Sequence, residues 1–249
     1  MATKSELKYI NKLLLKKYRE TEKKFIIEGK RFVTEGLIST YTCEFVVVNN
    51  DFKQKEAEYY NSLGKQNLEI LTVKNSEFEK ISSTQHSQGI LAVFKIPEKV
   101  INVEKEKTII CLENISDPGN VGTILRSCDW FGIKTVLLSK NCAELYNPKV
   151  LRASMGAVFN LNIIENVNII NEIGKLRSKG FKTYFADMEG RDYREINFNE
   201  RSIITFCNEA FGPTEELKEI CDASITIPKK GNIDSLNVAA AAAVILSAI

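Results

Sequence analysis

ENISDPGNVGTILR, residues 113–126, is the stretch around which the rest of the chain is organised. It follows an apolar run at 108–112 that is typical of a buried strand. The letters DPGN within it are rich in residues that end strands, and a helical pattern begins directly after them. Asn120 is therefore expected at the carboxyl end of a strand, which is where open α/β sheets bind ligands. Arg126 lies about one helical turn past Gly122, so its long side chain could reach back to that end.

Two later stretches have the same form, a strand followed by a polar turn and a helix start. Glu209 follows one of these strands. The other leads into an alanine-rich final helix, predicted over 233–249, which Asp234 or Ser235 would cap, with Asn237 in its first turn. Each turn alone fits an ordinary helix start with surface polar groups, but in a parallel sheet all three would lie at one edge. The polar groups that would then converge are Asn120, Arg126, Glu209, Ser235 and Asn237.

The chain before this region alternates helical and strand patterns, which predicts a small α/β domain over 1–97. Its predicted helices are 4–18, 30–39, 52–66 and 76–82, and its predicted strands are 25–29, 44–48, 68–73 and 89–96. The charged stretch 98–107 is interpreted as a linker. The alternation resumes over 108–249, which predicts a second α/β domain with a parallel sheet. Its strands are expected at 108–112, 134–139, 158–164, 181–187, 202–207 and 223–227.

The composition fits one large or two modest domains, because 44% of the 249 residues are hydrophobic and 27% are charged. No apolar run is long enough to cross a bilayer, and the charged start does not resemble a secretory signal. The six cysteines form no CxxC pair, so we expect reduced thiols in a cytoplasmic protein. Because His86 is the only histidine, a multi-histidine metal site and a histidine-based triad are disfavoured, and no metal is expected.

The net charge of +2 is unevenly distributed along the chain. Residues 1–31 contain ten lysines and arginines and four acids, which gives a local charge of +6, and the remainder sums to −4. A basic arm on a near-neutral body suggests contact with an anionic polymer. A solvated helix face is an equally good interpretation of the same lysines.

Taken together, the motifs resemble those of a known enzyme family. DPGNVGTILRSCDWFG (117–132), FCNEAFG (206–212) and IPKKGNIDSLNVAAAAAVIL (227–246) are similar, in this order and spacing, to the three motifs of the SpoU (TrmH-like) class of SPOUT RNA methyltransferases. LRASMGAVFNL (151–161) resembles a stretch typical of members that modify rRNA. KYINKLLLKKYRETEKKFIIEGKRFVTEGL (8–37) and STQHSQGILAVF (83–94) are similar to the substrate-binding domain that precedes the catalytic domain in these enzymes.

This resemblance implies methylation of a ribose 2′-hydroxyl in RNA, with S-adenosylmethionine as the methyl donor. It also implies an α/β catalytic domain with a deep carboxyl-terminal trefoil knot. A homodimer through the knot helices is implied as well, and the alanine-rich run 239–243 would permit its close packing. The two-domain form and the SMGAVF sequence favour ribosomal RNA (23S) over tRNA as the substrate.

The same resemblance assigns roles to individual residues. The polar catalytic set is Asn120, Arg126, Glu209, Ser235 and Asn237. The residues expected to contact the cofactor are Cys207, Asn208, Gly212, Ile227 and Leu236. The basic residues expected to bind RNA are Lys12, Lys16, Lys17, Arg19, Lys30 and Arg31. Three positions depart from the family pattern, because Cys207 and Ala210 stand where glycine is frequent and Lys229 stands where methionine is common.

Arg126 is the residue on which the expected chemistry depends. In this family the matching arginine has been cast as a general base, but a guanidinium has no free acceptor and a pKa above about 12. We prefer the hypothesis that Arg126 clamps the phosphate next to the ribose and stabilises the developing alkoxide.

Three alternatives to an rRNA methyltransferase fit parts of the sequence. A tRNA 2′-O-methyltransferase would carry the same motifs. A non-catalytic RNA-binding member of the fold would keep the basic arm but would not need Asn120, Arg126, Glu209 and Asn237 together. A nicotinamide-dependent dehydrogenase needs GxGxxG with an acid about 20 residues later, whereas GNVGTIL spaces its glycines differently.

Overall fold

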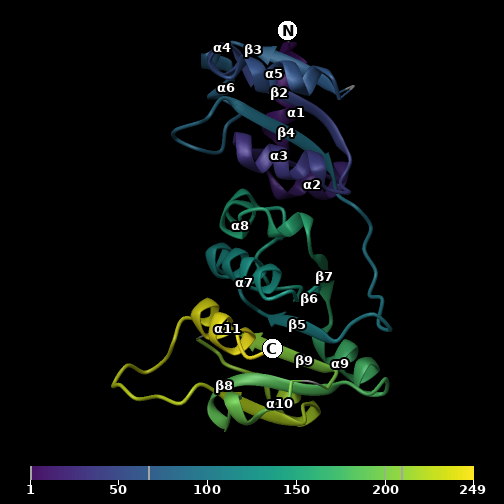
Figure 1. The fold of residues 1–249 in the computed structure, drawn as a ribbon, viewed down its shortest axis with the longest axis vertical. Helices are drawn as coiled ribbons and strands as arrows, with labels where there is room; N and C mark the ends of the chain where they lie inside the picture. Colours follow the sequence, from purple (N-terminus) through teal and green to yellow (C-terminus); the bar gives the residue numbers. More distant parts are fainter. Residues whose placement is uncertain (1, 67, 199, 209) are drawn as a thin grey trace. The chain divides into compact units, whose positions relative to one another are not determined.

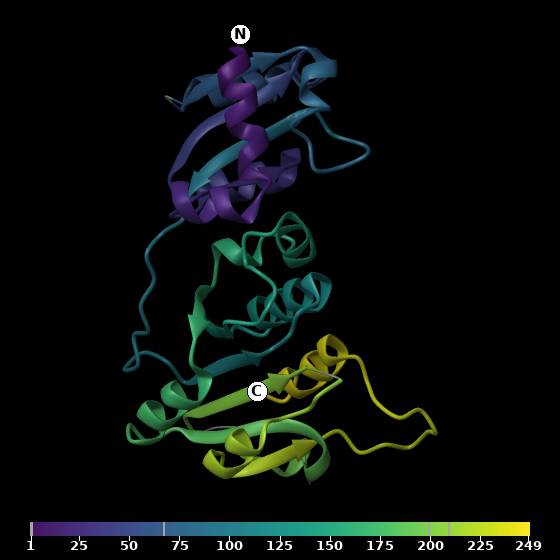
Figure 2. The same cartoon turned by 180° about the vertical axis from the view of Figure 1, so that it is seen from behind.

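The structure, a computed structural model, describes residues 2–66, 68–198, 200–208 and 210–249. Glu209, one of the predicted catalytic residues, lies outside these described residues. The chain divides into two compact units, which Figures 1 and 2 show from opposite sides. Unit 1 comprises Met1–Glu98 with Tyr146–Leu151, and unit 2 comprises Lys99–Leu145 with Arg152–Ile249.

Unit 1 contains a four-stranded mixed sheet in the order β1-β4-β2-β3. β2 and β3 run parallel, and β4 is antiparallel to both of its neighbours. The strands are β1 (Lys24–Glu28), β2 (Cys43–Asn49), β3 (Glu69–Val73) and β4 (Ile90–Lys95). The helices are α1 (Lys4–Leu13), α2 (Lys16–Glu22), α3 (Lys30–Ile38), α4 (Asn50–Lys55), α5 (Ala57–Gly64) and α6 (Asn75–Phe78). The core includes the fully buried Ile10, Val47 and Leu91.

Two long helices predicted in unit 1 are each divided in two. The helix predicted over 4–18 ends at Leu13, and α2 begins after Leu15, which has an extended backbone. The buried guanidinium of Arg19 donates to the carbonyl oxygen of Leu13 (2.9 Å) and so holds the turn between the helices. The later predicted helix is interrupted at Glu56. Both predictions are wrong in length, because the apolar period continues across the breaks.

Unit 2 contains a six-stranded sheet in the order β10-β8-β9-β5-β6-β7, in which every neighbouring pair is parallel. The strands are β5 (Thr108–Glu113), β6 (Thr135–Ser139), β7 (Asn162–Val167), β8 (Lys182–Asp192), β9 (Ser202–Cys207) and β10 (Ala223–Thr226). The helices of this half of the chain are α7 (Pro118–Trp130), α8 (Pro148–Ser154), η1 (Ala157–Phe159), α9 (Ile169–Arg177), η2 (Tyr193–Glu195), α10 (Glu215–Ile220) and α11 (Val238–Leu246). The predicted parallel sheet is confirmed. All residues of β5 and β9 are buried, as their unbroken apolar runs predict.

The strand order of unit 2 reverses between β5 and β9. The chain leaves β5 through α7 toward β6, whereas it leaves β9 through α10 toward β10, on the other side. The two connections therefore diverge from the carboxyl ends of adjacent strands. Such a switch point is where open parallel sheets form a ligand-binding crevice.

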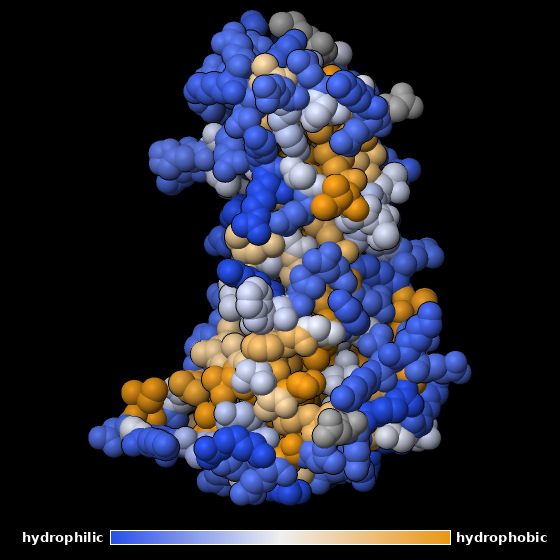
Figure 3. All heavy atoms as spheres, in the orientation of Figure 1, coloured by the Kyte–Doolittle hydropathy of each residue, from blue (hydrophilic) through white to orange (hydrophobic). Residues whose placement is uncertain are grey.

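Three predictions for the second half are wrong in part. The strand predicted over 181–187 is longer, because β8 continues to Asp192. The final helix does not begin at residue 233, because residues 227–237 form neither helix nor strand and α11 starts at Val238. The strand predicted over 158–164 starts only at Asn162, after the short helix η1. α11 packs against α7, and Figure 3 shows apolar side chains exposed over these helices. The trefoil knot stays a prediction.

The stretch interpreted as a linker makes specific contacts with unit 2. Arg201 donates to the carbonyl oxygens of Val103 and Glu106, and the ammonium of Lys99 donates to that of Leu161 (2.6 Å). Burial lowers the pKa of Lys99 to about 8. No helix within the described ranges is long and apolar enough to cross a membrane.

Candidate active site

The turn after β5 is held by hydrogen bonds at both of its ends. Asn114 has a left-handed backbone (φ 57°), and its N–H donates to the hydroxyl of Ser139 (2.9 Å). Asp117 then caps α7, because its carboxylate accepts from the N–H of Asn120 (2.8 Å) and proline occupies the first turn. Buried apolar side chains anchor the inner face of α7, which leaves Arg126 exposed on the outer face.

The turn after β9 is tied to the turn after β5. The backbone N–H of Asn208 donates to the carbonyl oxygen of Glu113 (3.1 Å), and its side-chain amide donates to that of Asn114 (3.1 Å). The Asn208 side-chain oxygen accepts from Ala210 N–H (2.8 Å), which closes the loop on itself. Gly212 follows with φ 64°, a conformation that favours glycine. Asn208 thus braces both turns at once.

The third turn reaches the first through one side-chain contact. The side-chain amide of Asn237 donates to the side-chain oxygen of Asn120 (2.9 Å), although the two residues are 117 positions apart. The other end of the same side chain caps α11, since its oxygen accepts from the N–H groups of Ala239 (3.0 Å) and Ala240 (3.4 Å). The prediction that Asp234 or Ser235 caps this helix is therefore wrong, and Asn237 is the cap.

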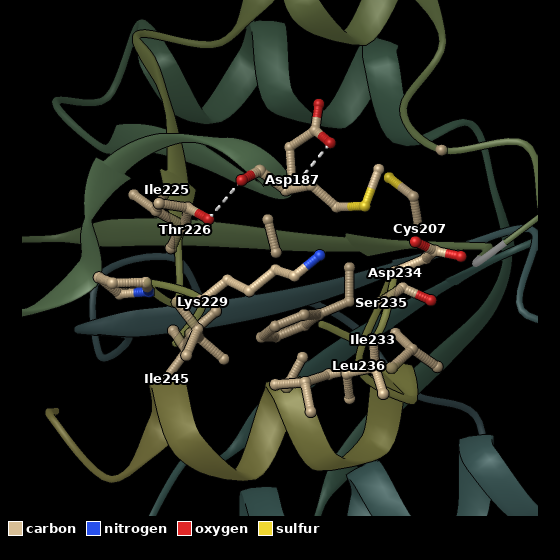
Figure 4. Close-up of a pocket in the computed structure, with 18 of the residues that line it drawn as sticks. Asp187, Cys207, Ile225, Thr226, Lys229, Ile233, Asp234, Ser235, Leu236 and Ile245 are labelled. Atoms are coloured by element: carbon tan, nitrogen blue, oxygen red, sulfur yellow. Dashed lines mark hydrogen bonds between the residues drawn. The ribbon is translucent and has the colours of Figure 1, made fainter. Parts of the chain in front are cut away.

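A cavity of about 420 Å³ opens beside these turns (Figure 4). Its lining comes from the middle of β8, from the carboxyl ends of β9 and β10 and from the segment that leads into α11. Ser235 of the predicted catalytic set lines it. All five predicted cofactor residues also line it: Cys207, Asn208, Gly212, Ile227 and Leu236.

The lining has an apolar part and a charged part. Phe206, Ile225 and Ile245 contribute buried apolar surface, whereas Asp234 contributes a carboxylate. Asp187 also lines the cavity, and its carboxylate accepts from the N–H of Met188 (2.7 Å). A cavity of this volume and mixed character suits a small molecule with a flat apolar portion and charged groups. Asp187 was missed by the sequence reasoning, because it lies in the middle of β8, just past the residues that pair with β9, and no polar turn follows it there.

Cys207 lies at the base of the cavity and is buried. Its thiol donates to the Glu113 carboxylate (3.7 Å), and burial raises the pKa of both groups. A thiol held protonated in this way is a poor nucleophile, so Cys207 contributes shape and not covalent chemistry. As the last residue of a strand it has an extended backbone that needs no glycine, which accounts for this departure from the family pattern.

A model of one protein family, described as the SpoU rRNA Methylase family, matches residues 107–247. The chain belongs to the SpoU rRNA methylase family. A second model, described as the MRM3-like substrate binding domain, matches residues 4–92. The convergence of the three turns in unit 2 therefore falls within the methylase part of this SpoU-family chain.

Three relatives of this SpoU-family protein illustrate how far the likeness extends. The Bacillus subtilis 23S rRNA (guanosine(2553)-2′-O)-methyltransferase RlmP is 28% identical over 246 residues, which cover 98% of this chain and 96% of that protein. The AdoMet-bound rRNA methyltransferase from Sinorhizobium meliloti is 25% identical with a TM-score of 0.85 over 99% of this chain and 94% of that one. An RNA 2′-O ribose methyltransferase structure is 26% identical with a TM-score of 0.83 over 99% and 95% of the two chains.

The predicted RNA-binding residues of this SpoU-family protein differ in exposure. Lys12, Lys16 and Lys17 are exposed on α1 and α2. Arg19 is buried and holds the turn between these helices, so it is not part of a surface. The remaining pair lies on α3, where Lys30 contacts Glu56 (2.7 Å) and Arg31 contacts Glu35 (3.0 Å). Within the described residues, no group of acidic, histidine and cysteine side chains could hold a metal ion.

Proposed function

We propose that this protein transfers a methyl group from S-adenosylmethionine to a ribose 2′-hydroxyl of ribosomal RNA. The observation that carries the proposal is the bond between Asn120 and Asn237, because it joins the first turn of α7, the helix that carries Arg126, to the segment that lines the cavity. Family membership and the names of the relatives support the same activity. The tRNA and non-catalytic alternatives are outcomes of the experiment below.

The cavity fits the cofactor by volume and by chemistry. Its apolar walls match an adenine ring, and its carboxylates match the cationic sulfonium and ammonium groups of the methionine part. Cys207, Ile227 and Leu236 would hold the cofactor through backbone groups and apolar contacts. Asn208 and Gly212 would shape the neighbouring loop. When bound, S-adenosylmethionine supplies a methyl group that its sulfonium has already activated.

Arg126 would stabilise charge at the attacking oxygen. The guanidinium keeps its proton and clamps the phosphate beside the target ribose, so that negative charge developing on the 2′-oxygen is met by a fixed cation. Asn120 would orient the ribose or Arg126, and Asn237 would keep Asn120 in place. Ser235 would shape the pocket. Glu209 would hold the loop or Arg126, and it lies outside the described residues.

RNA would be bound in part by the basic surface of unit 1. Lys12, Lys16 and Lys17 are exposed, and Lys30 and Arg31 follow on α3. Reversing the charge at the first three positions should weaken RNA binding and flatten its salt dependence, because each lost phosphate contact lowers the slope by roughly one. The control is the same reversal at Lys134, an exposed lysine at the amino end of β6. An unchanged slope in the triple variant would contradict this part of the proposal.

The proposal includes a homodimer through α7 and α11 and a cytoplasmic location. α11 presents alanines on its outer side, and Trp130 at the end of α7 is 83% exposed. Small side chains on a helix face permit the close approach of a second copy. The six cysteines are free thiols, which agrees with a reducing compartment. Light scattering of the purified chain should give twice the chain mass, and a monomer at micromolar concentration would contradict the dimer.

The experiment that tests the activity is a map of 2′-O-methylation in RNA from cells that lack the gene. We expect one ribose methyl to be missing from ribosomal RNA, to be restored by the native gene and not by Arg126→Ala. A methyl missing from tRNA alone would favour the tRNA alternative. A complete methylation pattern in both RNAs would favour a non-catalytic binder.

A further inference from the structure

Lys229 is a cation inside a cavity that otherwise suits a cationic ligand. It follows β10 by three positions, and it lines the cavity. In Figure 4 its side chain extends across the cavity and its ammonium points toward the middle. Its neighbour Lys230 also lines the cavity.

The ammonium of Lys229 is not committed to another group of the protein. No hydrogen bond or ion pair of Lys229 occurs within the part of the chain that the structure describes. Asp234 lies across the cavity from this ammonium in Figure 4, whereas the Asp187 carboxylate points away from it and accepts from the N–H of Met188 (2.7 Å). The charged part of the cavity therefore presents both signs to a ligand.

The charges of S-adenosylmethionine decide what Lys229 can face. The cofactor has two cations, the sulfonium and the ammonium, and one anion, the carboxylate of its methionine part. A lysine near either cation would repel the cofactor, because like charges at contact distance repel even in water. Facing the carboxylate, the same lysine would gain a charge-assisted hydrogen bond.

We propose that Lys229 binds the carboxylate of the methionine part of the cofactor, an inference that rests on the proposed function. In Figure 4, Ile225 and Ile245 lie on the same side of the cavity as the stem of Lys229, and Asp234 lies across the cavity from its ammonium. With the adenine against the two isoleucines, the methionine part lies between these charged groups, where Asp234 faces a cationic group and Lys229 faces the carboxylate. The lysine thus recognises the amino-acid end of the cofactor.

The test compares two ligands that differ only in the amino-acid end. S-adenosylhomocysteine carries the carboxylate and has no sulfonium, and 5′-methylthioadenosine lacks the amino-acid part altogether. Calorimetric titration of the full chain measures both affinities for the native protein, Lys229→Met, Lys229→Arg and the control Lys134→Met, an exposed lysine outside the cavity. Lys229→Met should weaken S-adenosylhomocysteine roughly tenfold and leave methylthioadenosine within about twofold. Lys229→Arg should retain most of the affinity, and Lys134→Met should change neither ligand by more than about twofold.

Each other outcome overturns the inference in a recognisable way. Equal weakening of both ligands by Lys229→Met would mean that the side chain only shapes the cavity. Unchanged binding of S-adenosylhomocysteine would mean that the ammonium faces solvent. Tighter binding of S-adenosylhomocysteine by Lys229→Met than by the native chain would place the lysine near the ammonium of the ligand. If the native chain bound none of these ligands, the cofactor assignment itself would fail, and this inference with it.

Discussion

The two sides of the cavity are built in opposite ways. On one side, the turns after β5 and β9 are joined by Asn208 and by its bonds to Glu113 and Asn114. On the other side, residues 228–236 are exposed, form neither helix nor strand, and make no hydrogen bond within the described chain. We call these the braced side and the open segment. The difference indicates that the braced side is preorganised, whereas the open segment depends on the cofactor for its contacts.

This division fits the two tasks of the proposed site. A reacting ribose and phosphate must be positioned closely, which requires groups already in place before the substrate arrives. A cofactor that enters and leaves at each turnover needs a side that can open. Asn237 lies where the two meet, since it caps α11 and also contacts Asn120.

The largest effect is expected at Arg126, next to the braced side. Arg126→Ala should lower kcat by about 10²–10³, because it removes the cation that faces the developing charge. The affinity for S-adenosylhomocysteine should not change, since Arg126 does not line the cavity. Steady-state kinetics and calorimetry separate these effects, with Lys134→Ala as the control. In a pH–rate profile, near-full activity of Arg126→Lys would show that a guanidinium is not required.

The open segment should respond strongly to the cofactor. Trypsin should cut the free protein after Lys229 and Lys230, which are exposed in a stretch without hydrogen bonds. S-adenosylhomocysteine at about 100 times its Kd should slow this cleavage by up to about 100-fold, because the bound ligand suppresses the open form. Cleavage after Lys65, exposed in unit 1, provides the control. Equal rates with and without ligand would remove the distinction between the two sides.

The braced side should instead respond to loss of its hydrogen bonds. Asn208→Ala removes one bond to Asn114 and one to Ala210 and should lower the free energy of unfolding by about 1–3 kcal/mol. Asn232→Ala in the open segment should change it by less than about 0.5 kcal/mol. Urea unfolding followed by circular dichroism measures both. If the two variants were equally stable, the braced side would not be held by Asn208.

The smallest effect is expected from Glu113, beneath the braced side. Burial raises the pKa of Glu113 in the folded protein. The protonated carboxyl group therefore contributes its full stability below the pKa that Glu113 has in the unfolded chain. This contribution is lost as the pH rises through the pKa of the folded state. At pH 7 the free energy of unfolding of Glu113→Gln should therefore be higher than that of the native chain, by about 0.5–1 kcal/mol. Near pH 4 the two free energies should be equal. Urea titrations at both pH values measure this. A difference that is independent of pH would contradict it.

The parallel sheet and the convergence of its turns were predictable because they depend on local patterns. The runs at β5 and β9 are apolar throughout, as strands buried on both faces must be. Polar residues directly after such strands then fall at one edge, and the contact between Asn120 and Asn237 follows from that arrangement. The identity of the cofactor residues came from the resemblance and not from periodicity.

The sequence-based predictions were wrong where the tertiary structure places a residue differently from what its local sequence pattern indicates. Ile233 and Leu236 continue the apolar period of α11, yet they line the cavity, so the helix was predicted too early. Arg19 lies among surface lysines, but its guanidinium is buried on the Leu13 carbonyl. Asp187 reads as the end of a strand, and only the position of β8 in the sheet places it at the cavity.

The most direct test of the central claim is methyl transfer from tritium-labelled S-adenosylmethionine to ribosomal RNA taken from cells that lack the gene. A methyl group on the 2′-oxygen blocks cleavage of the adjacent phosphodiester in alkali. We predict that alkaline hydrolysis leaves the label in resistant dinucleotides, and that Arg126→Ala lowers the rate of this labelling by about 10²–10³. Label recovered in mononucleotides, or no transfer by a chain that binds the cofactor, would contradict the account.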